Sequence, residues 1–135
     1  LTELGALFSE KIPQTATLLA GAELGGIPLV TTASMATNLP CIFIRNQKKE
    51  YGTSKQLEGK LSNTDKVVIV EDIATTGGQV LEAAKTIQEL GATVVSIIAV
   101  IDRCEGAREN VESAGFVFDS LFTTVDLGIN EVSTK

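Results

Sequence analysis

The sequence predicts an α/β protein built on a parallel, twisted sheet of about five strands flanked by helices. Short, continuous apolar runs rich in β-branched residues are typical of strands that are buried on both faces. Such runs occupy residues 16–20, 41–44, 67–70, 94–101 and 116–118. Helix-spaced segments lie between most of these runs, and this alternation indicates a parallel sheet with helices on both faces. With 135 residues in the chain, we expect residues 1–135 to form a single domain of this class.

Three segments are expected to form the connecting helices. Their apolar residues recur at helical spacing over residues 27–38, 78–90 and 106–114. The clearest stripe belongs to 78–90, and Gly91 follows it at the position where helices commonly end. Pro28 suits the first turn of the helix at 27–38, because that turn does not need its N–H group.

Residues 45–60 break the alternation of predicted strands and helices. The segment contains four lysines and one arginine and has no apolar stripe of its own. We therefore expect a long exposed loop, and long loops in compact domains are often functional.

Composition excludes several classes of protein. The net charge of -6 argues against a nucleic-acid-binding protein, because neutralising phosphates needs clustered Lys and Arg. The absence of histidine removes Ser/His/Asp and Cys/His catalytic arrangements. No apolar run approaches the roughly 20 residues that cross a bilayer, so we expect no membrane contact.

The first 12 residues have helical spacing broken by charges and lack a signal-peptide core, and the two cysteines form no readable disulfide framework. We expect a cytoplasmic protein.

The segment KVVIVEDIATTGGQVLEAA, residues 66–84, carries the main functional signal. A buried strand passes through two adjacent acids into TTGG and then into a helix. Glycines at such a junction let the backbone approach a ligand closely, and the first N–H groups of the helix have no partner within it. This pattern predicts a phosphate-binding loop. It is neither a Walker P-loop, which needs a lysine after the second glycine, nor a dinucleotide fingerprint.

The acids Glu71 and Asp72 would repel a phosphate but suit the other end of a sugar phosphate. Carboxylates accept hydrogen bonds from hydroxyl groups, and a ribose carries two neighbouring hydroxyls. A ribose 5-phosphate satisfies both halves of the motif, with its phosphate at residues 75–79 and its diol at the two acids.

This motif resembles the phosphoribosyl pyrophosphate (PRPP) motif of the type I phosphoribosyltransferases, and three further segments resemble the orotate branch of that family. GAELGGIPLVT at 21–31 resembles its pyrophosphate loop, and IRNQKKEYGTSKQLEGKL at 44–61 resembles its mobile catalytic loop. IDRCEGARE at 101–109 resembles the segment that carries an orotate-contacting arginine. The four motifs stand in the family's order. The resemblance implies the type I fold, with the N-terminal hood largely absent and a segment missing before residue 1.

The resemblance implies transfer of the phosphoribosyl group of PRPP to orotate, which gives orotidine 5-phosphate and pyrophosphate in pyrimidine biosynthesis. The residues implied to bind the ribose and its 5-phosphate are Glu71, Asp72, Ala74, Thr75, Thr76, Gly77, Gly78 and Gln79. The pyrophosphate loop is Ala22, Glu23, Leu24 and Gly25. The implied catalytic residues are Arg45, Lys48, Lys49, Tyr51 and Asp72. Thr75 and Arg103 are implied to contact orotate, for which a guanidinium group offers donors that match a carboxylate.

Magnesium is the implied cofactor. It would arrive on PRPP with no direct protein ligand, and Glu71 and Asp72 would reach it through water. The resemblance also implies a homodimer. Two alternatives stay open: a phosphoribosyltransferase for another base, such as a purine or uracil, and a non-catalytic PRPP-sensing regulator. Asn46 stands where family members commonly have a lysine, which favours the regulator.

Overall fold

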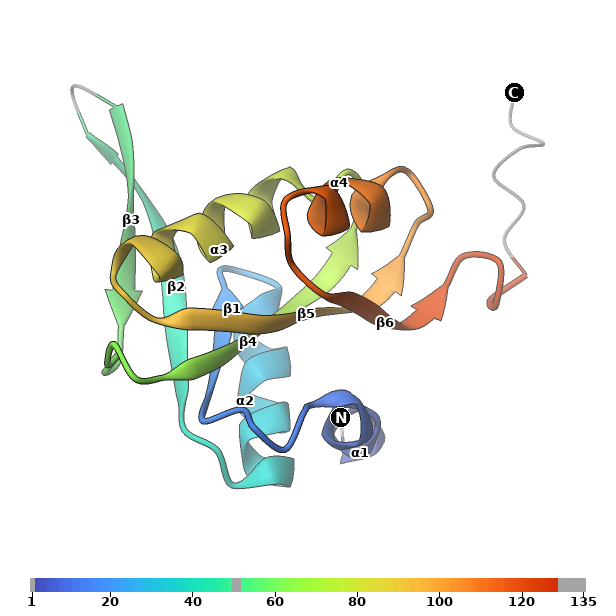
Figure 1. Cartoon of the computed structure of the whole chain (residues 1–135). Coiled ribbons are helices and arrows are strands. Elements are labelled where there is room, and N and C mark those ends of the chain that lie inside the picture. Colours follow the sequence, from blue (N-terminus) through green and yellow to red (C-terminus); the bar gives the residue numbers. More distant parts are fainter. Residues whose placement is uncertain (1, 50–51, 129–135) are drawn as a thin grey trace.

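A six-stranded sheet forms the middle layer of the computed structural model, which describes residues 2–49 and 52–128 (Figure 1). The strand order is β3-β2-β1-β4-β5-β6. The strands are β1 (Leu18–Ala22), β2 (Cys41–Lys49), β3 (Gly52–Glu58), β4 (Lys66–Ala74), β5 (Thr93–Asp102) and β6 (Phe118–Thr123). Every pair of neighbours is parallel except β2 and β3.

The five predicted strands are confirmed as the parallel part of the sheet, with shifted ends. The first begins two residues later than expected, and the last, predicted at 116–118, becomes β6 at Phe118–Thr123. Phe116 is buried beside β6, so its apolar character reflects core packing rather than strand pairing.

The prediction of a loop over 45–60 is wrong, because part of this segment extends β2 and part forms β3, the sixth strand of the sheet. β2 and β3 pair antiparallel as the two arms of a hairpin, with Phe43 opposite Glu58 and Lys49 opposite Gly52. β3 lies at the edge of the sheet, where a strand gains its hydrogen bonds from one neighbour and does not have to be apolar. A polar segment can therefore form a strand without an apolar pattern.

The helices cover the sheet in two pairs, which Figure 1 shows on opposite faces. They are α1 (Thr2–Lys11), α2 (Gly26–Thr37), α3 (Gly78–Glu89) and α4 (Ala107–Ser113). The apolar stripe of α3 is buried as predicted from Val80 to Ile87, but Leu90, the last residue of the predicted stripe, lies beyond the helix and is 54% exposed. α2 ends at Thr37, and the left-handed backbone of the following Asn38 lets its N–H donate to the Ser34 carbonyl. Within the described ranges, no helix is long and apolar enough to pass through a bilayer.

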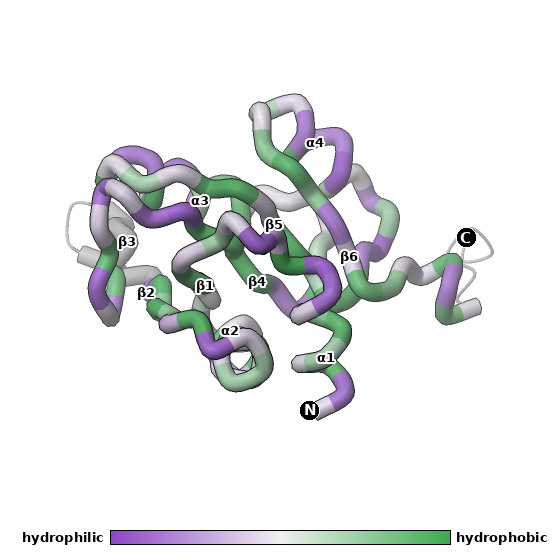
Figure 2. Tube along the Cα trace, turned by 60° about the horizontal axis from the view of Figure 1, so that its bottom comes forward, coloured by the Kyte–Doolittle hydropathy of each residue, from purple (hydrophilic) through white to green (hydrophobic). Residues whose placement is uncertain are grey.

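Side chains of β4 alternate between two hydrophobic cores. Val67 and Ile69 pack with α3 and α4, whereas Val68 and Val70 pack with α1 and α2. Figure 2 shows the hydrophobic colour concentrated along the central strands. Because side chains alternate along a strand, the next two residues of β4 also face opposite sides of the sheet. The fold thus separates Glu71 from Asp72.

Candidate functional site

The site lies where the strand order of the sheet reverses. β1 and β4 are neighbours, yet β1 leads into α2 on one face and β4 leads into α3 on the other. In open α/β sheets, ligands bind beyond the carboxyl ends of strands at such a point. The loop after β1 and the loop after β4 therefore flank one crevice.

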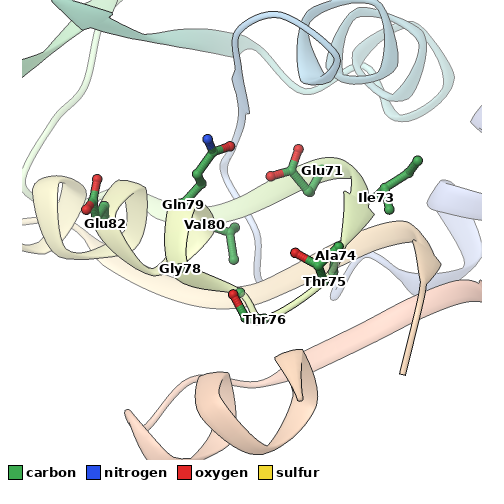
Figure 3. Close-up of a pocket in the computed structure, with 10 residues that line it drawn as sticks. Glu71, Ile73, Ala74, Thr75, Thr76, Gly78, Gln79, Val80 and Glu82 are labelled. Atoms are coloured by element: carbon green, nitrogen blue, oxygen red, sulfur yellow. The ribbon is translucent and has the colours of Figure 1, made fainter. Parts of the chain in front are cut away.

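A pocket of about 490 Å³ opens beside the loop after β4. Its lining residues come from β4, the loop and the first turns of α3: Glu71, Ile73, Ala74, Thr75, Thr76, Gly77, Gly78, Gln79, Val80 and Glu82. Figure 3 shows Glu71 on the strand, Gln79 on the helix, and the two threonines at the turn between them. The structure brings together every residue predicted for the ribose phosphate except Asp72.

Backbone geometry makes the loop suited to an anion. Gly77 precedes α3 with a φ of 88°, a left-handed conformation that glycine adopts without strain. No side chain in the described ranges caps the first turn of α3, so its N–H groups and the positive end of the helix dipole face the pocket edge. The exposed Thr75 and Thr76 add hydroxyl donors.

The two acids occupy different places. The Glu71 side chain lines the pocket, and its Oε1 accepts a hydrogen bond from the Asp72 N–H at 3.1 Å. The Asp72 carboxylate lies against Gly25 on the other face of the sheet, so closely that a Cβ at Gly25 would overlap it. Asp72 also accepts a hydrogen bond from the Ile73 N–H at 2.8 Å. Asp72 thus connects the strand of the phosphate loop to the N-terminus of α2, where a negative charge is favourable.

The loop of residues 22–25 leads from β1 into α2. The Glu23 N–H donates to the carbonyl of Ile44 at 2.9 Å, which ties the loop to β2. The Glu23–Leu24 peptide is cis, and the Leu24 side chain is 78% exposed. A Cβ at Gly21 would approach the Gly26 carbonyl oxygen to 2.5 Å, so this close turn from β1 into α2 requires glycine.

Arg103 follows the end of β5, beside the phosphate loop. Its N–H donates to the Ala74 carbonyl at 3.0 Å, and its half-buried guanidinium pairs with Glu105 at 3.1 Å. The neighbouring Asp102 is 5% exposed and accepts a hydrogen bond from the Cys104 N–H at 2.9 Å. The turn after β5 therefore holds Arg103 next to Thr75.

Among the hairpin residues, Arg45 has a described side chain, and it does not line this pocket. Arg45 is on β2 and pairs with Glu58 on β3 at 2.9 Å, and both side chains are about half exposed. Lys48 and Lys49 lie at the end of β2, and only their backbone is described. Tyr51 lies outside the described residues.

Two residues near the loop have no counterpart in the sequence prediction. Glu82 lines the pocket from α3, three residues after Gln79, a spacing that places both on one helix face. Asn110 of α4 donates from Nδ2 to the Thr76 carbonyl at 2.8 Å. Helical spacing could have indicated Glu82, whereas no local pattern connects Asn110 with a loop 34 residues earlier in the chain.

A tightly held metal does not fit the side chains that the structure describes. Among them, no group of three or more His, Cys, Asp or Glu residues could hold an ion. The two neighbouring carboxylates face opposite sides of the sheet, so they cannot form one ligand set. A hard cation at this edge would need a ligand's own oxygens.

Comparisons with known proteins agree with this geometry. A family model described as phosphoribosyl transferase domain matches residues 3–132. The orotate phosphoribosyltransferase of Pyrococcus horikoshii is 50% identical over 109 residues, which cover 81% of this chain and 59% of that protein. The orotate phosphoribosyltransferase of Natronomonas pharaonis is 42% identical over 127 residues, which cover 94% of this chain and 72% of that protein. The chain thus spans about three fifths to three quarters of the length of these relatives.

A solved structure shows the same fold. The crystal structure of Mycobacterium tuberculosis orotate phosphoribosyltransferase in complex with PRPP matches with a TM-score of 0.76 and 30% identity, covering 94% of this chain and 75% of that one. Sheet order, the loop after β4 and the match over nearly the whole chain lead to one conclusion: this chain belongs to the phosphoribosyl transferase domain family.

Proposed function

We propose that the protein transfers the phosphoribosyl group of PRPP to orotate. The observation that carries this proposal is the pocket in which Glu71 and the glycine loop before α3 meet. One wall offers a carboxylate for sugar hydroxyls, and the other offers backbone N–H groups for a phosphate. The names of the relatives, orotate phosphoribosyltransferase, support orotate as the acceptor.

The proposed binding mode uses both sides of the crevice. The 5-phosphate lies against Thr75, Thr76 and the first turn of α3, and the ribose diol lies against Glu71. Asp72 acts at the boundary between the ribose and the loop of residues 22–25, because its carboxylate contacts Gly25. Pyrophosphate then lies over the backbone of that loop.

The proposed chemistry depends on charge. As the bond from C1 to pyrophosphate breaks, positive charge develops on the ribose and negative charge on the leaving group. Cations that fold over the pyrophosphate would stabilise this charge more strongly in a closed site than in open water. We assign this task to Arg45, Lys48 and Lys49, together with Tyr51. Arg45 would have to exchange its partner Glu58 for pyrophosphate.

Arg103 is the proposed contact for the base. It stands beside Thr75 at the end of β5, and its partner Glu105 holds it at the surface. Orotate carries a carboxylate that would replace the Glu105 carboxylate, because a guanidinium group binds both in the same planar geometry.

Magnesium is proposed as part of the substrate complex. It would bind oxygens of PRPP and keep several waters, so it needs no protein ligand set of its own. We further propose a homodimer in the cytoplasm, as the family resemblance implies, and measurement of mass in solution tests the dimer.

The decisive experiment compares bases. The chain is incubated with Mg²⁺ and PRPP, and pyrophosphate release is measured with orotate, uracil, hypoxanthine or adenine. Release with orotate alone is expected, and Arg103→Gln should raise the KM for orotate without changing the KM for PRPP. Release with another base would make the protein a different phosphoribosyltransferase. PRPP binding without release for any base would indicate a regulator.

A further inference from the structure

A hydrogen bond from α4 holds the loop that would bind the 5-phosphate. Asn110 donates from its side-chain Nδ2 to the carbonyl of Thr76 at 2.8 Å, and this hydrogen bond links two segments 34 residues apart. The Asn110 side chain is exposed, whereas Ala107 and Val111 on the same helix are 0% exposed and carry its packing. The contact is therefore not needed to bury an apolar surface.

The hydrogen bond fixes the direction of a peptide group. In a planar trans peptide, the C=O of one residue and the N–H of the next point in opposite directions. Asn110 draws the Thr76 carbonyl toward α4, so the N–H of Gly77 points away from α4. Gly77 and both its neighbours line the pocket, which means that this N–H is directed to the pocket side.

Gly77 alone would not hold this orientation. Its φ of 88° is one of several conformations open to glycine, and Gly78 follows directly. Gly77 has no side chain to restrain it, although α4 lies close by: a Cβ at Gly77 would be 3.2 Å from Val111 Cγ2 and 3.5 Å from Ala107 Cα. The side chain of Asn110 supplies the directional restraint that two successive glycines lack.

We propose that Asn110 is a positioning residue for the phosphate-binding loop, which acts by holding the peptide between Thr76 and Gly77 with its N–H toward the phosphate of the substrate. This inference rests on the proposed function, because it requires a phosphorylated ribose in the pocket. The residue touches no substrate atom and takes no part in bond breaking. Its effect is on the affinity for the phosphate end.

Binding of ribose 5-phosphate and of pyrophosphate, each measured by calorimetry on the full chain, tests this role. Asn110→Ala removes the donor, and Asn110→Asp keeps the shape but offers only acceptors to the Thr76 carbonyl. Both variants should weaken ribose 5-phosphate binding about three- to tenfold, the usual effect of one lost hydrogen bond. Pyrophosphate binding should stay within about twofold, because the loop of residues 22–25 and the hairpin hold that group.

Glu109→Gln, on an exposed residue of the same helix, is the matched control and should bind both ligands as the unmodified chain does. Thermal unfolding of all variants separates loop positioning from loss of fold. If the Asn110 variants lose affinity for both ligands equally, or if Asn110→Asp binds ribose 5-phosphate as tightly as the unmodified chain does, this inference is wrong. The proposed function would be unaffected by either result. If the unmodified chain binds neither ligand, the proposed function and this inference both fail.

Discussion

Different kinds of contact hold the phosphate loop after β4 and the β2–β3 hairpin. The loop continues a strand that is buried on both faces and leads into a helix whose apolar stripe is buried. The hairpin lies at the edge of the sheet, and its described side-chain link is an exposed ion pair between Arg45 and Glu58. Core packing of β4 and α3 fixes the two ends of the loop, and the hydrogen bond from Asn110 holds its middle, whereas a pair of exposed charges fixes little. We infer that binding of the sugar phosphate relies on preformed geometry and that handling of pyrophosphate relies on movement.

The strongest test of this contrast removes the charges of both acids. Glu71→Gln combined with Asp72→Asn should weaken PRPP binding about 10- to 100-fold, because charge-assisted hydrogen bonds become neutral ones. The melting temperature should change little, since both acids are only partly buried and follow the four fully buried residues at 67–70 of β4. Calorimetric PRPP affinity equal to that of the unmodified chain would remove the ribose assignment.

A smaller effect is expected from Gly77→Ala. The positive φ of Gly77 strains any other residue by about 1–2 kcal/mol, and the new methyl group would press on Val111. We expect lower stability in denaturant unfolding and PRPP binding weaker by about tenfold.

Gly115→Ala is the matched control, because Gly115 has a φ of 95° and open space around it. This variant should lose similar stability while it binds PRPP normally. If both variants bind PRPP equally well, the loop is not preformed for its ligand.

A substitution in the hairpin should lower turnover and leave stability nearly unchanged. Lys49→Ala should lower turnover about five- to tenfold, because one cation over the leaving group is lost and Lys48 compensates in part. Stability should stay within about 0.5 kcal/mol, because Lys49 pairs with Gly52 through its backbone, which alanine keeps. Lys60→Ala, on an exposed lysine beyond β3, provides the control. Undiminished turnover in Lys49→Ala would show that the catalytic cations lie elsewhere.

The smallest effect belongs to Glu58→Gln. The ion pair with Arg45 is about half exposed, so its loss should cost less than about 0.5 kcal/mol of unfolding free energy. Turnover should not fall, because the change releases Arg45 for pyrophosphate. If urea unfolding shows that Glu58→Gln loses more than about 1 kcal/mol of unfolding free energy, the ion pair holds the hairpin firmly and the contrast with the phosphate loop fails.

Sequence reasoning succeeded where structure is decided locally. β4 and α3 were predictable because four buried residues, two glycines and an apolar stripe all lie within 25 residues of one another. It failed at β3, because an edge strand made of polar residues has no pattern that distinguishes it from a loop.

Contacts between distant segments could not be predicted either. The approach of Asp72 to Gly25 depends on the pairing of β1 with β4, and the bond from Asn110 to Thr76 depends on the position of α4. In both cases strand order in space, which a single sequence does not fix, decides which residues meet.

The alternation along β4 makes the site sensitive to the length of the strand as well as to its composition. Inserting one residue between Val70 and Glu71 would exchange the sides of the sheet that the two carboxylates face, while the apolar part of the strand stayed in register. The chain could still fold, but each acid would meet the surroundings of the other. Such length changes in the second half of β4 should therefore abolish ligand binding even in variants that retain their melting temperature.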